Sequence, residues 1–347
     1  MTKKSISLNF CAVLLLFTST VPVGAQTEAN THDQSVNVTA AAEALLQTLS
    51  DGQRAAVLFK FNDAEQRVRW SNLPTGIYQR RGLRTGDLKP DQLQAVFAVI
   101  QATLSPAGWQ QIVDNVAGDE VLHKNSGGRP GRVIFGKDEY YFSILGAPSR
   151  TEPWMWQFGG HHLAINATII GDHITLAPSL TGGQPMRYVK DEKQIVQMAD
   201  EVKLAFELVN SLNDEQKKKA VLEDQFADLA LGPGRDDVHP APAGIRADEL
   251  TEQQHVLLKK LLAQRIGLLN EEDAAERQQA IEAQLAETWF SWHGPTSSGS
   301  AAYYRIQGPR VFMEYSPQQL GGSPQDHIHA MYREFENDYG LEWLNEK

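Results

Sequence analysis

An internal repeat is the feature of this sequence that most constrains its fold. The segment "LLQTLSDGQRAAVLFKFND", which starts at Leu45, resembles "LVNSLNDEQKKKAVLEDQFAD", which starts at Leu208. Similarity between two long stretches of one chain indicates that a structural unit is used twice.

Two further pairs of segments recur in the same order. "GLRTGDLKPDQLQAVFAVIQATL" from Gly82 resembles "GIRADELTEQQHVLLKKLLAQRI" from Gly244, and "YFSILGAPS" resembles "WFSWHGPTS". Three ordered matches predict two homologous halves, which we place at residues 40–202 and 203–347. The chain length fits one large domain or two ordinary ones, and the sheets of the two halves can merge into one domain.

Each half begins with a helical pattern and ends with strands. In residues 90–103 apolar side chains recur at i, i+3, i+4 and i+7, which is typical of an amphipathic helix. Short β-branched or aromatic runs predict strands at 132–136, 139–146, 161–169 and 172–178, with later counterparts in "ETWFSWHG", "AAYYRIQG" and "RVFMEYS". We therefore predict an α+β fold in which two helix-then-antiparallel-sheet halves pack about a pseudo-twofold axis.

The first residues predict export. Two lysines precede the apolar run Phe10–Phe17, which is too short to cross a bilayer, and the small residues around Ala25 suit cleavage there. We expect a signal peptide at 1–25, a flexible N-terminus at 26–39, and a periplasmic or secreted protein with no later membrane span. The alternative is an uncleaved N-terminal anchor.

Composition excludes several kinds of ligand and partner. The only cysteine, Cys11, lies in the predicted signal peptide, so the mature chain has no disulfide and no thiolate ligand. The formal charge of -11 becomes -13 when the two lysines of residues 1–25 are removed, because that segment has no acidic residue. Nucleic acid and anionic lipid need a basic surface, so a small molecule is the expected partner. A transition metal would have to be held by His and carboxylate ligands.

The segment "DHIHAMYREF" at 326–335 allows two structures. Its apolar residues fit a helical stripe, which would place His327 and His329 on different faces. Its match to "DHITLAP" in the first half favours a strand, and alternate residues of a strand share a face. In the strand alternative the two imidazoles lie side by side, as a metal site requires.

Two more residues are predicted to join them. The strands "HHLAIN" and "PRVFME" match in the repeat, which places His162 and Glu314 on the side away from the apolar residues. We predict that His162, His327 and His329 bind a divalent transition metal (Zn, Cu, Ni, or Fe/Mn) and that Glu314 is a ligand or general base. The alternative is that these are ordinary surface or core histidines.

Aromatic and polar side chains on the same strands form a candidate site for a substrate or organic anion. The alternative is inter-sheet packing, because Trp and Tyr commonly fill cores. GxSxG, HExxH, Walker and dinucleotide motifs are absent from the sequence. The predicted substrate-binding residues are His161, Trp156, Gln157, Asn166, Tyr304, Arg305, Arg310 and Arg333.

Three long segments are also distinctive as strings: "WMWQFGGHHLAINATIIGD", "YYRIQGPRVFMEYSPQ" and "DHIHAMYREFENDYG". Together they resemble a bacterial family of exported proteins, domain of unknown function 3500, over nearly all of the mature chain. The resemblance implies export and no established activity. In that family the last segment more often has Asn at the place of Asp326 and Pro at Phe335 or Glu336. Pro there favours an extended backbone, so its absence here leaves the helical alternative open.

The sequence thus favours an exported metalloprotein with a mononuclear His/carboxylate site, acting as a hydrolase-type enzyme that activates water. One alternative is a non-catalytic periplasmic protein that binds a small organic ligand. Another is a protein for metal storage or delivery. The sequence does not indicate an oligomeric state.

Overall fold

The structure is a computed structural model that describes residues 33–126, 132–223 and 228–345. The predicted signal peptide at 1–25 and the segment 26–32 lie outside these ranges. In the described ranges no helix is both long and apolar enough to cross a membrane.

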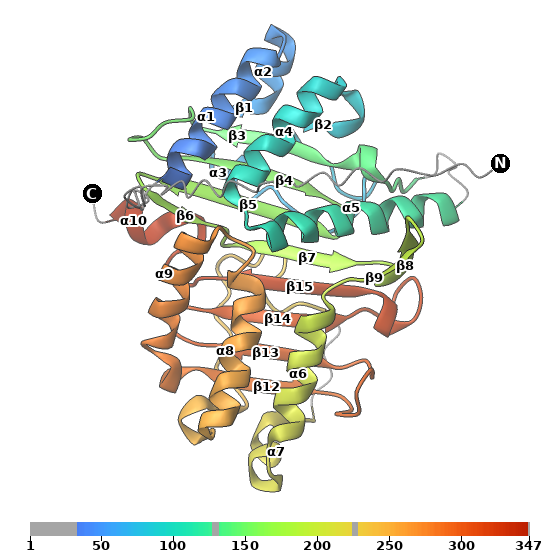
Figure 1. The fold of residues 1–347 in the computed structure, drawn as a ribbon, viewed down its shortest axis with the longest axis vertical. Helices are drawn as coiled ribbons and strands as arrows, with labels where there is room; N and C mark the ends of the chain where they lie inside the picture. The colour runs from blue at the N-terminus through green and yellow to red at the C-terminus, as the bar shows by residue number, and fades with distance from the viewer. Residues whose placement is uncertain (1–32, 127–131, 224–227, 346–347) are drawn as a thin grey trace, which may run out of the picture. The chain divides into compact units, whose positions relative to one another are not determined.

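The long helices lie on one side of a large sheet, facing the viewer in Figure 1. Burial of one face fixes them there: in the first helix Val38, Ala42 and Leu45 are fully buried at i, i+4 and i+7. The α-helices are α1 (Asp33–Thr48), α2 (Asp51–Val57), α3 (Ala64–Arg67), α4 (Pro90–Thr103), α5 (Pro106–Asn125), α6 (Ala199–Ser211), α7 (Asp214–Ala220), α8 (Glu252–Ile266), α9 (Glu271–Glu282) and α10 (Leu341–Asn345).

Strands from both predicted halves contribute to the same 13-stranded sheet. A separate hairpin is formed by β8 (Arg187–Lys190) and β9 (Lys193–Val196). The strands of the large sheet are β1 (Leu58–Phe59), β2 (Leu83–Arg84), β3 (Tyr141–Leu145), β4 (Trp154–Gly160), β5 (Leu163–Ile170), β6 (His173–Thr175), β7 (Ser179–Gly183), β10 (Val221–Leu222), β11 (Ile245–Arg246), β12 (Trp289–His293), β13 (Tyr303–Gln307), β14 (Phe312–Pro317) and β15 (Ile328–Arg333).

The order of strands brings distant parts of the chain together at the centre of the sheet. It runs β1-β3-β4-β5-β7-β15-β14-β13-β12-β10, with β2, β6 and β11 paired at the side of β3, β5 and β12. The pairs β1–β3 and β10–β12 are parallel and the other pairs are antiparallel, so the sheet is mixed and the fold is α+β. At the centre β7 pairs with β15, and Gly182 lies opposite His329.

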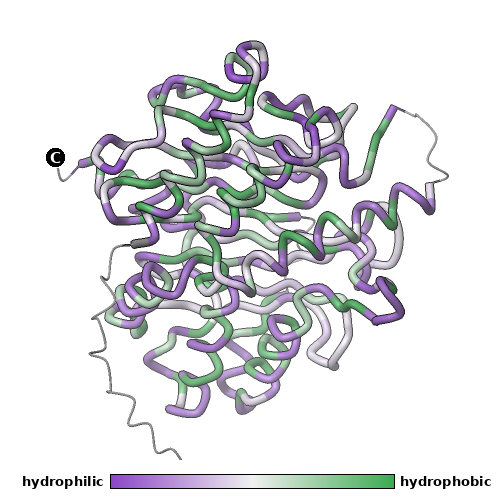
Figure 2. Tube along the Cα trace, turned by 45° about the horizontal axis from the view of Figure 1, so that its top comes forward, coloured by the Kyte–Doolittle hydropathy of each residue, from purple (hydrophilic) through white to green (hydrophobic). Residues whose placement is uncertain are grey.

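The two faces of the sheet have different chemistry. Leu163, Ile165 and Ile328 point toward the helices and belong to the two large hydrophobic clusters. The alternate positions, such as Asn166 and Glu314, are fully buried polar residues that face the loops on the other side. Figure 2 shows hydrophobic and hydrophilic residues alternating along the helices, as expected for elements with one buried side.

Several sequence predictions can be compared with this fold. The helix predicted at 90–103 has the bounds of α4, and the HxH segment is strand β15. The strand predicted at 132–136 is wrong: only Ile134 makes an isolated bridge, to Thr75, and a 3-10 turn follows Gly136, whose φ is 112°. Residues 33–39, which the sequence analysis places in a flexible N-terminus, begin α1, whose apolar face is buried.

Asp273 near the start of α9 provides a test of how this helix is held. Its carboxylate accepts hydrogen bonds from Ile174 N at 3.0 Å and Asn270 Nδ2 at 2.6 Å, and burial raises its pKa from 3.8 to about 6. Between these two pH values the unfolded chain ionises before the folded one, so Asp273 lowers the stability of the folded protein as pH rises. Above about pH 7 the loss is nearly complete, at roughly 3 kcal/mol in total.

We therefore expect Asp273→Asn to gain stability relative to wild type by roughly 2 kcal/mol between pH 4 and pH 7. Denaturant unfolding of both proteins at the two pH values measures this difference. The variant also loses the hydrogen bond from Asn270, which changes its free energy of unfolding by the same amount at both pH values. A stability difference that does not change with pH would contradict the argument.

Candidate metal centre

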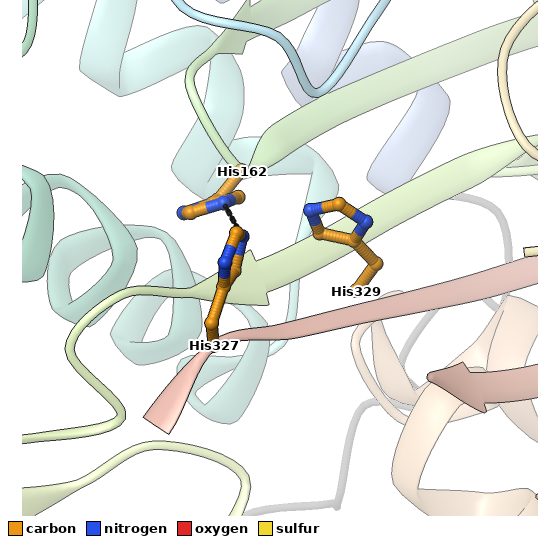
Figure 3. Close-up of side chains that lie close together, drawn as sticks. All are labelled: His162, His327 and His329. Carbon is orange, nitrogen blue, oxygen red and sulfur yellow. Dashed lines mark hydrogen bonds between the residues drawn. The ribbon is translucent and has the colours of Figure 1, made fainter. Parts of the chain in front are cut away.

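Three histidines from distant parts of the chain converge at one end of the central strands. His327 directly precedes β15, His329 lies in it, and His162 lies in the turn between β4 and β5, as Figure 3 shows. One nitrogen from each ring can be chosen so that all three lie within 4.8 Å of one another. All three residues are buried, with 3% (His162), 9% (His327) and 7% (His329) exposed. The strand arrangement therefore produces the convergence predicted from the sequence.

The backbone at His162 is specialised for this position. Its φ is 60°, in the left-handed region that non-glycine residues rarely adopt. Its N–H donates to Asn72 O at 3.0 Å, and Asn115 Nδ2 donates to its carbonyl at 3.3 Å. A Cβ on Gly182 would lie 2.4 Å from Ile328 O and 3.5 Å from His162 Cβ, so glycine leaves room for the turn. The surroundings hold the backbone of His162, and with it the position of its ring, in an otherwise unfavourable conformation.

Hydrogen bonds fix which nitrogen two of the rings present. His327 Nδ1 lies 2.5 Å from Leu320 O, and because a carbonyl only accepts, Nδ1 carries the proton. His329 Nδ1 lies 3.0 Å from Asp228 Oδ1 and donates to that carboxylate. Both rings therefore have a lone pair on Nε2. His162 Nε2 is 2.9 Å from His327 Nε2 and donates to it (Figure 3), so a metal ion would replace this proton.

Two of the three imidazoles are kept neutral by their surroundings. Burial lowers the pKa of His327 to about 4, and burial together with the neighbouring histidines lowers the pKa of His162 well below its usual value. Only a neutral imidazole binds a metal. Proton competition for these two residues is therefore weak at neutral pH.

Polar residues around the three rings were not predicted from the sequence. Asn72 Nδ2 lies 3.1 Å from His329 Nε2, and Gln318 Nε2 donates to Asp228 Oδ1 at 3.0 Å. Asp228 and Asn72 lie in loops that are 101 and 257 residues from His329 in the chain. No local pattern marks them, because only the fold brings these loops to the strand.

His161 packs beneath the site and is not part of the three-histidine group. Its ring centroid is 3.6 Å from that of His162, and its Nδ1 lies 2.7 Å from Asp119 Oδ1. Burial lowers its pKa. The His161 ring is thus held between His162 and α5.

Glu314 is directed away from the histidines. It lies opposite Met331, whereas His329 lies opposite Ser316. Its carboxylate accepts hydrogen bonds from Ala230 N, Leu231 N and Tyr303 Oη, each at 2.8 Å. Among the described residues it does not join the group of candidate ligands. The structure thus does not place Glu314 as a metal ligand or as a base at the metal; it anchors the loop that carries Asp228.

The predicted aromatic clamp is not formed. Trp156 and Tyr304 point to the helix side, where Trp156 Nε1 donates to Thr103 Oγ1 at 3.1 Å and Tyr304 Oη donates to Glu201 Oε1 at 2.5 Å. Gln157 lies on the opposite face, because residues alternate along a strand. These aromatics are core residues, which was the alternative considered from the sequence.

Gln157 and Asn166 bind one another on the loop side of the sheet. Gln157 Nε2 donates to Asn166 Oδ1 at 3.0 Å, Gln66 Nε2 donates to Gln157 Oε1 at 3.0 Å, and Asn166 Nδ2 donates to Pro178 O at 2.8 Å. These buried bonds join the α3 region to β4 and β5. They do not bring either side chain into the histidine group.

The three predicted arginines also have other partners. Arg310 binds Glu342 at 2.8 and 3.1 Å. It precedes β14, at the opposite end of that strand from Ser316, the residue that pairs with His329. Arg333 contacts Asp338 at 2.7 Å and Asp236 at 3.1 Å. Arg305 Nη2 donates to Ala241 O at 3.2 Å. They hold loops against the sheet and do not surround the histidines.

The donor set fits a metal in its chemistry. Three neutral imidazoles suit zinc, copper, nickel or iron better than magnesium or calcium, which prefer oxygen ligands. Asp228 supplies the carboxylate that commonly orients a metal-binding histidine. Three protein ligands also leave a position for water or substrate on a four-coordinate ion.

Comparison with known proteins identifies a family but no activity. No curated protein and no solved structure gives a match to this chain. A family model described as "Protein of unknown function (DUF3500)" matches residues 31–341, which include the three histidines and nearly the whole fold. The chain belongs to this family.

Proposed function

We propose that this protein binds one divalent transition metal ion through His162, His327 and His329. The observation that carries the proposal is the convergence of three buried imidazoles, two of them with the Nδ1 proton already engaged by an acceptor. All ligands are nitrogens, since Glu314 lies outside the group. Zinc, copper and nickel are therefore favoured over manganese.

We further propose that the centre is hydrolytic. A divalent ion held by three imidazoles lowers the pKa of a bound water toward neutrality. The residues of this chain have supporting roles: Asp228 orients His329, Leu320 O orients His327, and Asn72 lies within hydrogen-bond distance of the His329 ring. Glu314 fixes the loop of Asp228.

Export and duplication are parts of the same proposal. The signal-like segment at residues 1–25 supports a periplasmic or secreted protein. Two correspondences support duplication: β1 and β10 pair in parallel with β3 and β12, and the register Ser143–Gln157–Asn166 corresponds to Ser291–Arg305–Glu314. Under this proposal the metal centre lies where the two halves meet.

Elemental analysis of the purified mature protein tests the proposal. We expect one equivalent of a transition metal, or one equivalent bound after chelation and reloading with zinc, copper or nickel. Protein that contains no metal and whose melting temperature is unchanged by all three ions would overturn it. A panel of ester and amide substrates then separates the functions: metal-dependent turnover indicates a hydrolase, and stoichiometric metal without turnover indicates storage or delivery.

Asp228→Ala tests the orienting role of the carboxylate. Loss of the hydrogen bond to His329 Nδ1 frees the ring and its tautomer, so metal affinity is expected to fall about 10–100-fold. Competition with a fluorescent chelator measures the affinity. The control is Asp237→Ala, an exposed acid in the same loop region that leaves net charge matched. Equal affinities of the two variants would show that Asp228 does not act through His329.

A further inference from the structure

A cavity of about 430 Å³ lies on the opposite, helix side of the strand that presents the histidines. It is bounded by α6, the β8–β9 hairpin, the segment 298–301 and the adjoining ends of β14 and β15. Its volume falls within the roughly 300–1,000 Å³ typical of small-molecule sites. Ile328 in its wall points away from the face of His327 and His329, because neighbouring residues of a strand alternate.

The interior of this cavity is aromatic and aliphatic. Phe206 and Tyr315 contribute rings to it, and Ile328 and Met186 lie beside them. The ring of Tyr315 stacks on that of Tyr304, with the ring centroids 5.6 Å apart and the ring planes at 6° to one another. Val196 also lines the cavity and is 39% exposed, so part of the apolar wall is open to solvent. Such walls favour a ligand with an apolar, preferably planar, body.

The cavity also contains a cation that has no acidic partner. Arg187 lines the cavity and is exposed, and its guanidinium makes no ion pair or hydrogen bond with any residue that the structure describes. This differs from the other arginines discussed above, which are bound to carboxylates or carbonyls. Lys203 is only loosely paired with Glu207, at 3.8 Å. A guanidinium without a partner beside aromatic rings suits a carboxylate or sulfonate.

We propose that this cavity binds a small organic anion, with its apolar body against Phe206 and Tyr315 and its acidic group on Arg187. The site is separate from the metal centre, and no residue is shared between them. The ligand belongs to the class of aromatic or alicyclic carboxylates and sulfonates. This inference does not rest on the metal.

Calorimetric titration of the full protein with 2-naphthoate, and with neutral 2-naphthamide, tests the proposal. We expect saturable, one-to-one binding of 2-naphthoate and weaker binding of the amide. Arg187→Gln is expected to weaken 2-naphthoate at least about 10-fold while leaving the amide unchanged, because it removes a charge-assisted hydrogen bond. Ala199→Trp, which fills the cavity from an exposed position of α6, is expected to abolish binding of both.

Lys193→Gln is the matched control, since it removes an exposed charge from the same hairpin without lining the cavity. Absence of binding to the wild-type protein overturns the proposal. So does binding that survives both Arg187→Gln and Ala199→Trp, or an equal loss in Lys193→Gln, which would indicate only general charge attraction. The same titration with metal-free protein should give the same result, so failure here is distinct from failure of the metal site.

Discussion

Replacing His327 and His329 together by alanine is expected to reduce bound metal from about one equivalent to almost none. The change removes two of three ligands, and a single imidazole at His162 cannot hold an ion against water. Wild type should also be stabilised by added metal, by about 4 kcal/mol when the free ion is 1,000 times the dissociation constant. The double variant should show no such stabilisation. Elemental analysis and thermal unfolding with and without metal measure the two effects.

The control for this variant removes two histidines elsewhere. His123→Ala with His239→Ala also deletes two imidazole rings, but from positions outside the three-histidine group. It therefore tests for adventitious binding to other histidines. Its metal content should equal that of wild type. If metal content falls equally in both double variants, or in neither, the proposed ligands are wrong.

Arg265→Met is expected to cause the largest loss of stability, about 3–5 kcal/mol. Arg265 of α8 lies 2.6 Å from Glu201 of α6, and these side chains are only 3% and 4% exposed. Arg265 also donates to Thr181 of β7, the strand next to β15. Removing the cation leaves the Glu201 carboxylate buried without a positive charge, and burial of an uncompensated charge is costly.

A double variant separates this charge effect from packing. Arg265→Met with Glu201→Gln removes both charges and retains an acceptor for Tyr304 Oη. It should recover more than half of the lost free energy of unfolding. Denaturant titration of the three proteins gives the values. A double variant that is no more stable than Arg265→Met would mean that the loss comes from packing alone.

The regular elements could be predicted because their patterns are local. The buried stripe of α4 and the alternating residues of β3, β5 and β14 are visible in single segments. The repeat also helped with His327 and His329. The apolar spacing of their own segment fits a helix, but the matching segment in the first half has the pattern of a strand. Segment 132–136 was mispredicted since its β-branched residues do not pair with a neighbouring strand beyond the single bridge of Ile134.

The site was predictable only in part. Strand alternation places His327 and His329 on one face, and the repeat brings His162 near them. Alternation did not reveal that Glu314 would turn to the N–H groups of Ala230 and Leu231, because the loop that covers it has no strand or helix pattern. For the same reason Asp228 was missed.

Trp156 shows how the register of neighbouring strands corrects a prediction. It pairs with Ala167, which shares the core side with Ile165, so the ring had to face the helices. On the loop side of the sheet, the residue of this pair that could contact a ligand is Gln157, not Trp156. Strand register, once known, determines which of two neighbouring residues can reach a site.

X-ray absorption at the metal edge of protein loaded with one equivalent of zinc tests the central claim most directly. The account predicts three imidazole nitrogens and one further nitrogen or oxygen at about 2.0–2.1 Å, with the imidazole scattering reduced in the double variant that lacks His327 and His329. A first shell made only of oxygen atoms, or a spectrum unchanged by loss of those two residues, would contradict it.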